Sequence, residues 1–292
     1  MFQSLQEIIE ECGRTGKPFW KVIQQEDCRE ENMTEEESFE RMTRIYEAMR
    51  SSDENYEPTL RSASGLVGTD AEKLRKREEQ GKLLNDRFTV HVMERALRVA
   101  ESNACMKRIA AAPTAGSCGV VPAVLLSMQE KMEYSEEKMI QALYVAAGIG
   151  GVIAARASLS GAAGGCQAEI GSASSMAAGA AAALLGGTPE QMAHAAAMAM
   201  SALLGLVCDP VAGLVEVPCV KRNVAGAMNA VLYADMAMAG IESRIPPDEV
   251  IDAMKSVGHA MSMDLRETGR GGLAGTPTGQ EIAERMQNSG AK

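Results

Sequence analysis

The sequence predicts an all-α fold, an Ala/Gly-rich helical domain with Gly-rich loops at the breaks between helices. Of its 292 residues, 46% are hydrophobic, yet only 3% are aromatic. The apolar residues are mainly Ala, Met, Leu, Val and Ile, and 28 glycines accompany them. Because Ala, Leu and Met are strong helix formers and strand-forming residues are comparatively scarce, we expect closely approaching helices with small side chains.

The first part of the chain is polar and charged, and we expect helices over residues 1–60. Ser4 with Glu7 and Thr34 with Glu37 fit the capping box, in which a side-chain oxygen and a carboxylate satisfy free backbone donors at a helix start. A Ser/Gly loop, Ser62–Leu74, then runs into a polar helix. We treat residues 1–292 as one domain, with a polar N-terminal part of about 1–85 and an apolar core of about 86–292.

Helices alternate with Gly/Pro breaks through the apolar part. One helix is expected over Asp86–Ala111, where Pro113 ends it, and an apolar helix follows the loop after it. Ser135 caps the next helix, expected over Glu136–Ala157, whose first turn is acidic. Its apolar run is short and rich in Ala and Gly, which favours a buried core helix over a membrane span.

Four further helices are expected, and their starts carry recognisable signals. Thr188 caps a helix whose first position is Pro189 and whose capping box Gln191 completes. The expected helices cover Ser174–Leu185, Pro189–Leu206, Asn223–Ala239 and a last one from about Pro247. The tail LRETGRGGLAGTPTGQ is expected to form an ordered loop.

The charge and the cysteine count limit the function classes. The net charge of −10 disfavours nucleic acids and anionic membrane surfaces as partners. The N-terminal run MFQSLQEIIEECGR is charged from the start, so we expect no signal peptide and a cytoplasmic protein. In a reducing cytoplasm, the seven cysteines are expected to be free, catalytic or metal-bound.

Four Gly-rich breaks interrupt otherwise helical sequence, at Ser62–Gly68, Thr114–Gly119, Ser160–Gly165 and Asp209–Gly213. Glycine admits positive φ and lets a ligand approach the backbone, and a helix start after such a loop offers free N–H groups. A small carboxylate would suit these positions. For any single loop, helix turning and packing is the favoured explanation, but four in one chain favour a shared pocket.

Three cysteines lie at helix breaks beside Gly or Pro: Cys166 after GAAGG, Cys208 before Asp209, and Cys219 after Pro218. Such breaks leave backbone N–H groups free to support thiolate ligands. Zinc would require a fourth protein ligand or an open catalytic site with a histidine or carboxylate. Three thiolates fit an iron–sulfur cluster with one open iron better, although spacing alone is equally compatible with inert buried cysteines.

The remaining thiols and imidazoles are weaker metal candidates. Cys12 and Cys28 lie in the polar region, where nothing indicates a sheltered site. The histidines are scattered without ligand spacing, and each is expected to be a satisfied surface or core residue: His91, His194 and His259.

Several motifs together resemble the iron–sulfur-dependent L-serine dehydratases, specifically the α subunit of the two-subunit bacterial form. They are APTAGSCGVVPAVL, SGAAGGCQAEIGSASSMAAGA, GLVCDPVAGLVEVPCVKRN, SASGLVGTDAEKL and LRETGRGGLAGTPTG. The resemblance covers essentially the whole chain. It implies an all-helical catalytic domain and a [4Fe–4S] cluster held by Cys166, Cys208 and Cys219, with one iron open. The separations of 42 and 11 positions fit that pattern.

The resemblance also implies the reaction, a lyase that dehydrates L-serine to pyruvate and ammonia in amino-acid degradation and gluconeogenesis. The open iron would act as a Lewis acid on the serine hydroxyl, a general base would remove the α-proton, and no pyridoxal phosphate (PLP) is required. The base is unassigned, with Lys73, Asp209 and Glu216 as weak candidates. The residues expected to bind the substrate's carboxylate and amine are Ser62, Ser64, Gly65, Thr114, Ala115, Gly116 and Ser117.

Four more residues have two readings each. Cys118 could line the pocket, but a packed side chain is favoured. Lys73 could bind the substrate carboxylate or be a solvated helix lysine. Lys221 and Arg222 could offset the negative charge of an iron–sulfur cluster or lie at the surface.

The chain departs from the family pattern in two ways. Single-chain relatives carry an additional α/β domain with a histidine-containing motif, so a separate β subunit is expected to supply it in a heterodimer or larger assembly. Some relatives end in a cysteine that folds onto the open iron, whereas this chain ends in QNSGAK. We therefore expect water or substrate at the fourth site.

Three alternatives compete with this interpretation. An L-cysteine desulfidase on the same scaffold would share the three cysteines. A PLP-dependent dehydratase would require an alternating β/α pattern around a lysine, which is lacking. A non-catalytic helical interaction module would bind no iron.

Overall fold

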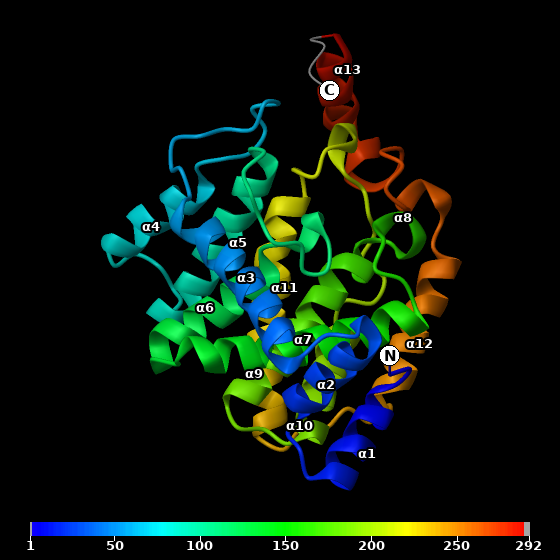
Figure 1. Ribbon diagram of the computed structural model, residues 1–292. Helices are drawn as coiled ribbons and strands as arrows, with labels where there is room; N and C mark the ends of the chain where they lie inside the picture. The colour runs from blue at the N-terminus through cyan, green and yellow to red at the C-terminus, as the bar shows by residue number, and fades with distance from the viewer. Residues whose placement is uncertain (1, 289–292) are drawn as a thin grey trace.

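The computed structural model describes residues 2–288, and helix α9 (Ser172–Leu184) lies at the centre of their fold (Figure 1). It packs against α6 (Val120–Met132), α7 (Glu136–Arg156), α10 (Pro189–Ser201) and α11 (Cys219–Met238). No described residue belongs to a β-strand, and one isolated bridge joins Cys208 to Arg266. The predicted all-α fold is confirmed.

Small side chains permit the close helix approach that the composition predicts. All but one of the residues of α9 are buried. A Cβ added at Gly179 would lie 2.1 Å from Cδ1 of Ile149 on α7. A larger residue at this position would therefore push the two central helices apart.

The N-terminal helices α1 (Leu5–Thr15), α2 (Phe19–Glu31) and α3 (Glu35–Glu54) contribute to the same hydrophobic core as the central helices. The predicted capping box at Thr34 is present. The box predicted at Ser4 is only half formed. Its hydroxyl accepts from the Glu7 N–H, but the Glu7 carboxylate accepts from the N–H of Gln3, one residue before Ser4.

Helix α5 (Arg87–Ala104) follows α4 (Asp70–Glu79) and ends seven residues before the predicted end at Ala111. The reason is a Schellman motif. Met106 adopts a left-handed φ of 60°, its N–H donates to Asn103 O, and the N–H of Lys107 donates to Ser102 O. Methionine gives no sequence signal for this conformation, so Pro113 wrongly seemed to mark the helix end.

Three other predicted boundaries differ from those of the structure. Helical structure before α9 begins at a π-helical segment, η2 (Gln167–Gly171), rather than at Ser174. α10 ends at Ser201, before the predicted Leu206, and the turn that follows is held when the Gly205 N–H donates to Gln167. α11 begins at Cys219 and not at the predicted Asn223.

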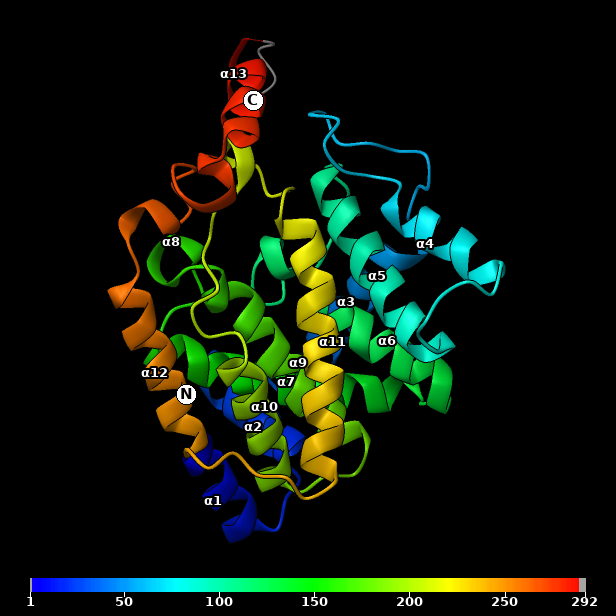
Figure 2. The same ribbon diagram turned by 180° about the vertical axis from the view of Figure 1, so that it is seen from behind.

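Helix α12 (Pro247–Ala260) is not the last helix, as we had expected, because part of the tail forms α13 (Pro277–Asn288). Thr276 accepts from the Gly279 N–H, and Pro277 takes the first helical position, which is a regular helix start. α13 stands at one end of the molecule, next to the 3₁₀ turns η3 (Val211–Gly213) and η5 (Gly272–Gly275) (Figures 1 and 2). The C-terminal segment QNSGAK, for which we expected no cysteine ligand to the open iron, lies largely outside the described residues.

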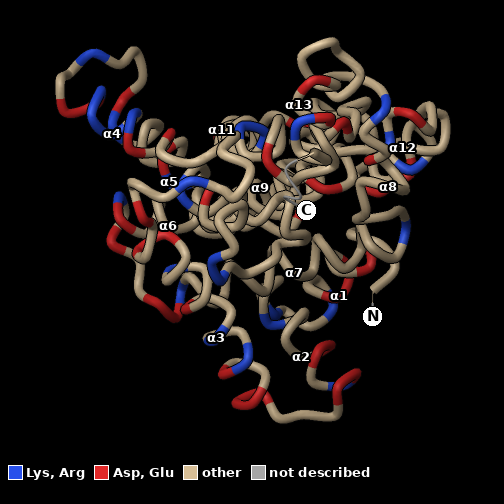
Figure 3. Tube along the Cα trace, turned by 90° about the horizontal axis from the view of Figure 1, so that it is seen from above, with Lys and Arg blue, Asp and Glu red and all other residues tan. Residues whose placement is uncertain are grey.

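Helix α7 is the one described helix long and apolar enough to cross a membrane. Of its most apolar window, 67% is buried inside the fold, as the core-helix interpretation predicts. Charged residues of both signs are interspersed along the peripheral helices, whereas α9 carries none (Figure 3). The apolar helices thus form the interior that positions the loops described next.

Candidate functional site

The three candidate thiols lie on three separate segments, and those of Cys208 and Cys219 are near enough to Cys166 to interact with its charge. Cys166 directly precedes η2, Cys208 lies in the loop after α10, and Cys219 is the first residue of α11. All three are buried. The backbone of Cys208 is fixed on both sides, because its N–H donates to Leu265 O at 2.9 Å and its carbonyl accepts from the Glu267 N–H at 2.7 Å.

The pKa values of these thiols reflect burial and mutual proximity. Burial raises the pKa of Cys166 to about 11 and that of Cys219 to about 12, and it also raises the pKa of Cys208. The next cause for Cys208 and Cys219 is the charge of Cys166, which would repel a second thiolate. At neutral pH the metal-free thiols are therefore protonated, and binding a metal group would release their protons.

The spacing of the sulfurs distinguishes between two kinds of metal group. The one described group of at least three His, Cys, Asp or Glu ligand atoms within 4.8 Å of one another is elsewhere, so at least one pair of the three sulfurs is more than 4.8 Å apart. Two thiolates on one zinc ion, at about 2.3 Å each, cannot be more than about 4.6 Å apart. An all-thiolate set spread further suits an iron–sulfur cluster, whose irons each take a separate thiolate.

Arg222 is the cation of this region. Its guanidinium lies 2.8 Å from Asp209 Oδ1, as an ion pair without hydrogen-bond alignment, and donates to Val207 O at 2.8 Å. Its charge also favours the thiolate of Cys166. The expectation that Arg222 offsets negative charge here agrees with this position. Lys221 instead is exposed and pairs with Asp70 at 3.5 Å.

Asp209 is an interior anchor. It is 2% exposed, and besides meeting Arg222 it accepts from the Leu273 N–H at 2.7 Å. The C-terminal Gly-rich loop must pass close to it, because a Cβ at Gly272 would lie 2.4 Å from Asp209 Oδ2. Both oxygens are thus engaged in joining the Cys208 loop, α11 and the C-terminal segment, which favours a structural role over that of a base.

The loop Ser62–Gly68 is tied to the segment before Cys219. Glu216 is 7% exposed and accepts hydrogen bonds from Ser62 Oγ at 2.8 Å and from Ser64 Oγ. At Gly65, with φ of 74°, the N–H donates to Ser62 O and closes the turn. Three residues singled out from the sequence therefore form one hydrogen-bonded unit.

The loop Thr114–Gly119 is held by Asn223, which the sequence analysis took only as a helix start. Its side-chain amide donates to Gly116 O at 2.8 Å and to Cys219 O at 3.0 Å, and its Oδ1 accepts from the Gly119 N–H at 2.8 Å. Ala115 and Ser117 belong to the 3₁₀ turn η1 (Ala115–Ser117) in this loop. The loop backbone is thereby fixed against the first turn of α11.

Cys118, in the same loop, is fully buried, and burial raises its pKa to about 12. Its thiol lies 3.9 Å from Val99 O. This position agrees with the packed side chain that we favoured.

Glu169 is the functional candidate that sequence reasoning missed. It lies on the π-helical segment η2, a rare conformation that is frequent at functional sites. Its Oε1 accepts from Thr114 Oγ1 at 2.7 Å, and its Oε2 is 4.0 Å from Cys208 Sγ. Burial is the main cause that raises its pKa. A signal was available, because Glu169 is the only charged residue between Arg156 and Glu190.

Lys73 fits the solvated interpretation. Its side chain is 66% exposed, and its ammonium pairs with Asp70 at 2.6 Å within the first turn of α4. These contacts do not direct it to the region of the three thiols.

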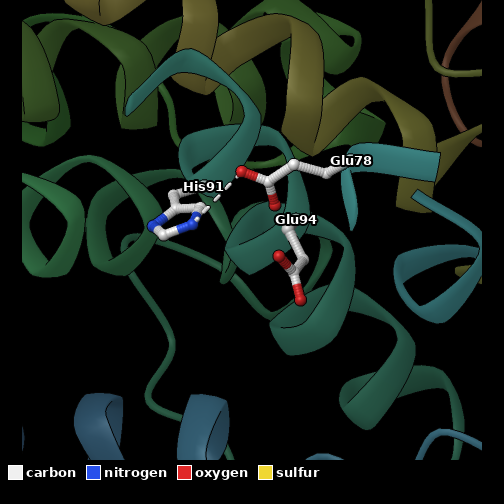
Figure 4. A group of neighbouring side chains, drawn as sticks. All are labelled: Glu78, His91 and Glu94. Carbon is white, nitrogen blue, oxygen red and sulfur yellow. Dashed lines mark ion pairs between the residues drawn. The ribbon is translucent and has the colours of Figure 1, made fainter. Parts of the chain in front are cut away.

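The group of ligand atoms within 4.8 Å consists of Glu78, His91 and Glu94, at the junction of α4 and α5 (Figure 4). His91 Nε2 lies 3.6 Å from Glu78, while Glu94 pairs with Arg98. Arginine thus neutralises part of this group, and we interpret it as an ion-pair network in which His91 is satisfied.

The other two histidines differ from each other. His259 is exposed. His194 is partly buried, and its Nδ1 has no hydrogen-bond partner, so the prediction that it is satisfied is wrong for that atom.

Comparison with known proteins gives a consistent result. Residues 14–274 match the model of the serine dehydratase alpha chain family. A Bacillus subtilis protein named probable L-serine dehydratase, alpha chain, is 48% identical over 286 residues, which are 98% of this chain and 95% of the relative. The L-serine dehydratase alpha chain of Peptoniphilus asaccharolyticus is 41% identical over 97% of both chains.

A longer relative matches in part. L-serine dehydratase 1 of Escherichia coli is 38% identical over 278 residues, which are 94% of this chain but only 61% of the relative. The family match spans most of the chain and includes the segments that carry Cys166, Cys208, Cys219 and Glu169. The chain belongs to the serine dehydratase alpha chain family.

Proposed function

We propose that this chain is the α subunit of an L-serine dehydratase, which converts L-serine to pyruvate and ammonia. The observation that carries the proposal is that three buried thiols from three separate helix breaks lie near enough to interact electrostatically, in a chain whose relatives are named L-serine dehydratase alpha chains. Cys166, Cys208 and Cys219 would hold a [4Fe–4S] cluster. The all-thiolate donor set, with sulfurs that are not all within 4.8 Å of one another, fits such a cluster better than one zinc ion.

The difficult part of the reaction is the loss of hydroxide from carbon 3 of serine, because hydroxide is a poor leaving group. When bound, the cluster supplies a Lewis-acidic iron without a protein thiolate, which can assist the departure of the hydroxyl. The protein holds this group in a buried place where Arg222 offsets negative charge and Asp209 fixes the surrounding loops. Elimination gives aminoacrylate, whose tautomer is hydrolysed by water to pyruvate and ammonia.

The two Gly-rich loops would bind the substrate. We assign Ser62, Ser64 and Gly65 to one side of the site, since Glu216 ties this loop to the turn before Cys219. Thr114, Ala115, Gly116 and Ser117 would form the other side, since Asn223 fixes that loop against Cys219 itself. The loops thereby have defined positions relative to the thiols.

The base that removes the α-proton is assigned to a β subunit. The described contacts of Asp209 and Lys73 engage both groups elsewhere, and Glu216 accepts from two serines. The relatives named as alpha chains support the existence of a partner chain. The match covers only 61% of the Escherichia coli relative, and the remainder of that protein could correspond to a separate subunit here. We further propose a cytoplasmic location, where a reducing environment preserves thiolate ligands.

The test is anaerobic co-purification with the β subunit, followed by iron and sulfide analysis and by assays with L-serine and L-cysteine. We expect about four irons and four sulfides per α chain and faster pyruvate formation from L-serine. Faster release of sulfide and pyruvate from L-cysteine would replace the proposal by a cysteine desulfidase. Protein without iron, even after reconstitution with iron and sulfide, would refute the cofactor assignment.

A further inference from the structure

Glu169 is a partly buried carboxylate without a cationic partner. Its two closest polar contacts are the Thr114 hydroxyl on Oε1 and the thiol of Cys208 near Oε2. Among the described residues, no Lys, Arg or His forms an ion pair with it. Removing a carboxylate from water is costly unless a cation or several donors compensate, so a cation that enters from outside the chain would be bound favourably here.

Two glycines lie close against this carboxylate. A Cβ at Gly116 would lie 3.1 Å from Glu169 Oε1. A Cβ at Gly161 would lie 2.7 Å from Glu169 Oε2 and 2.9 Å from Cys208 Sγ. A side chain at residue 161 would thus stand between the carboxylate oxygen and the sulfur. Glycine at both positions lets the backbone approach the carboxylate closely, and Glu169 remains partly exposed beside Cys208.

We propose that Glu169 Oε2 accepts a hydrogen bond from the α-ammonium of the substrate and so selects amino acids over 2-hydroxy acids. Thr114 would hold the other oxygen and so orient the carboxylate. The inference rests on the proposed function, which assigns Cys208 to the iron–sulfur cluster. The ammonium and the hydroxyl of serine are on adjacent carbons joined by a bond of about 1.5 Å, so the groups that bind them must be close neighbours. Glu169 and Cys208 are such neighbours.

The substitution Glu169→Gln tests this role, because glutamine keeps the shape and removes the charge. L-Alanine and L-lactate are suitable probes, since they differ only in the ammonium or hydroxyl on carbon 2 and neither can lose water from carbon 3. Calorimetric titration of the cluster-loaded complex with each probe would measure binding without turnover. We expect the wild-type protein to bind L-alanine more tightly, and E169Q to lose about 10- to 100-fold of that affinity, as for a charge-assisted hydrogen bond. L-Lactate binding should stay equal or improve.

Two further variants control for indirect effects. Glu267→Gln removes a carboxylate whose charge acts on Glu169. It leaves the proposed contact between Glu169 and the substrate ammonium unchanged. We expect it to alter the alanine-to-lactate preference by less than threefold. Glu169→Asp keeps the charge and should retain part of the preference. Iron and sulfide content, measured for each variant, separates loss of substrate binding from loss of the cluster.

The outcomes separate this inference from the proposed function. Equal affinity of the wild-type complex for L-alanine and L-lactate would overturn the inference whatever the variants do. An unchanged preference in E169Q with a full cluster would overturn it as well, while serine turnover by the wild-type complex would still stand. Wild-type protein without iron or without serine turnover would count against the proposed function instead.

Discussion

Under this account, Cys166, Cys208 and Cys219 each contribute one thiolate ligand to the cofactor. Replacing any one by alanine is expected to abolish both the bound iron and serine turnover, because a cluster with two protein ligands is held too weakly. Cys12→Ala and Cys28→Ala should keep both. Iron and sulfide analysis of the five variants, prepared anaerobically side by side, provides the measurement. Equal loss of iron in all five would contradict the ligand assignment.

The anchoring role of Asp209 predicts a loss of stability. In Asp209→Asn the partly buried guanidinium of Arg222 loses its charged partner, and the free energy of unfolding should fall by about 1–3 kcal/mol. Urea unfolding of the metal-free protein measures this change. Glu242→Gln, at an exposed position, is the control and should change the free energy by less than about 0.5 kcal/mol. Indistinguishable values for the two variants would rule out the anchor.

At the scale of single residues, the sequence identified side chains whose chemistry suits the site. It did not show which of them already have hydrogen-bond or ion-pair partners within the protein. The motifs singled out Ser62 and Glu216 separately, and only the fold shows that they bond to each other across 154 positions. Glu169 was overlooked although its isolation in an uncharged stretch was visible. Asn223 gave no signal, because its role depends on a loop more than 100 residues earlier.

At the scale of elements, boundaries that carry a local capping signal were predicted better than boundaries that do not. The capping boxes at Thr34 and Thr188 begin their helices where expected, since the partners are three residues apart. The ends of α5 and α10 were wrong, because a left-handed methionine sets one and Gln167 binds the turn after the other. The π-helical segment that carries Glu169 has no local signature at all.

A matched pair of glycines tests the close packing of helices. Gly13 is in α1, where an added Cβ meets nothing within 4 Å, so Gly13→Ala should stabilise the protein by about 0.5–1 kcal/mol through helix propensity. Gly179 is in α9, where the same Cβ would meet Ile149 at 2.1 Å. Gly179→Ala should therefore destabilise it by about 1–3 kcal/mol. Denaturant unfolding of both variants checks the signs, and stabilisation by both would disprove the tight α7–α9 contact.

For the molecule as a whole, composition was enough to predict the fold class, because Ala, Met and Gly favour closely packed helices and strand formers are scarce. The assembly of the site could not be derived in the same way. It depends on contacts between Thr114 and Glu169, between Ser62 and Glu216, and between Asp209 and Leu273, whose partners are 55, 154 and 64 positions apart. Such contacts follow from the packing of helices and not from local patterns.

The central claim is that L-serine binds at an iron that carries no protein thiolate. Mössbauer spectroscopy of the anaerobic, ⁵⁷Fe-labelled complex measures this directly, because it resolves the environment of individual irons. We predict that L-serine changes the signal of one iron in four and leaves the other three as they were, and that Cys208→Ala protein shows no such signal. A spectrum unaffected by saturating L-serine in a complex that still forms pyruvate would contradict the account.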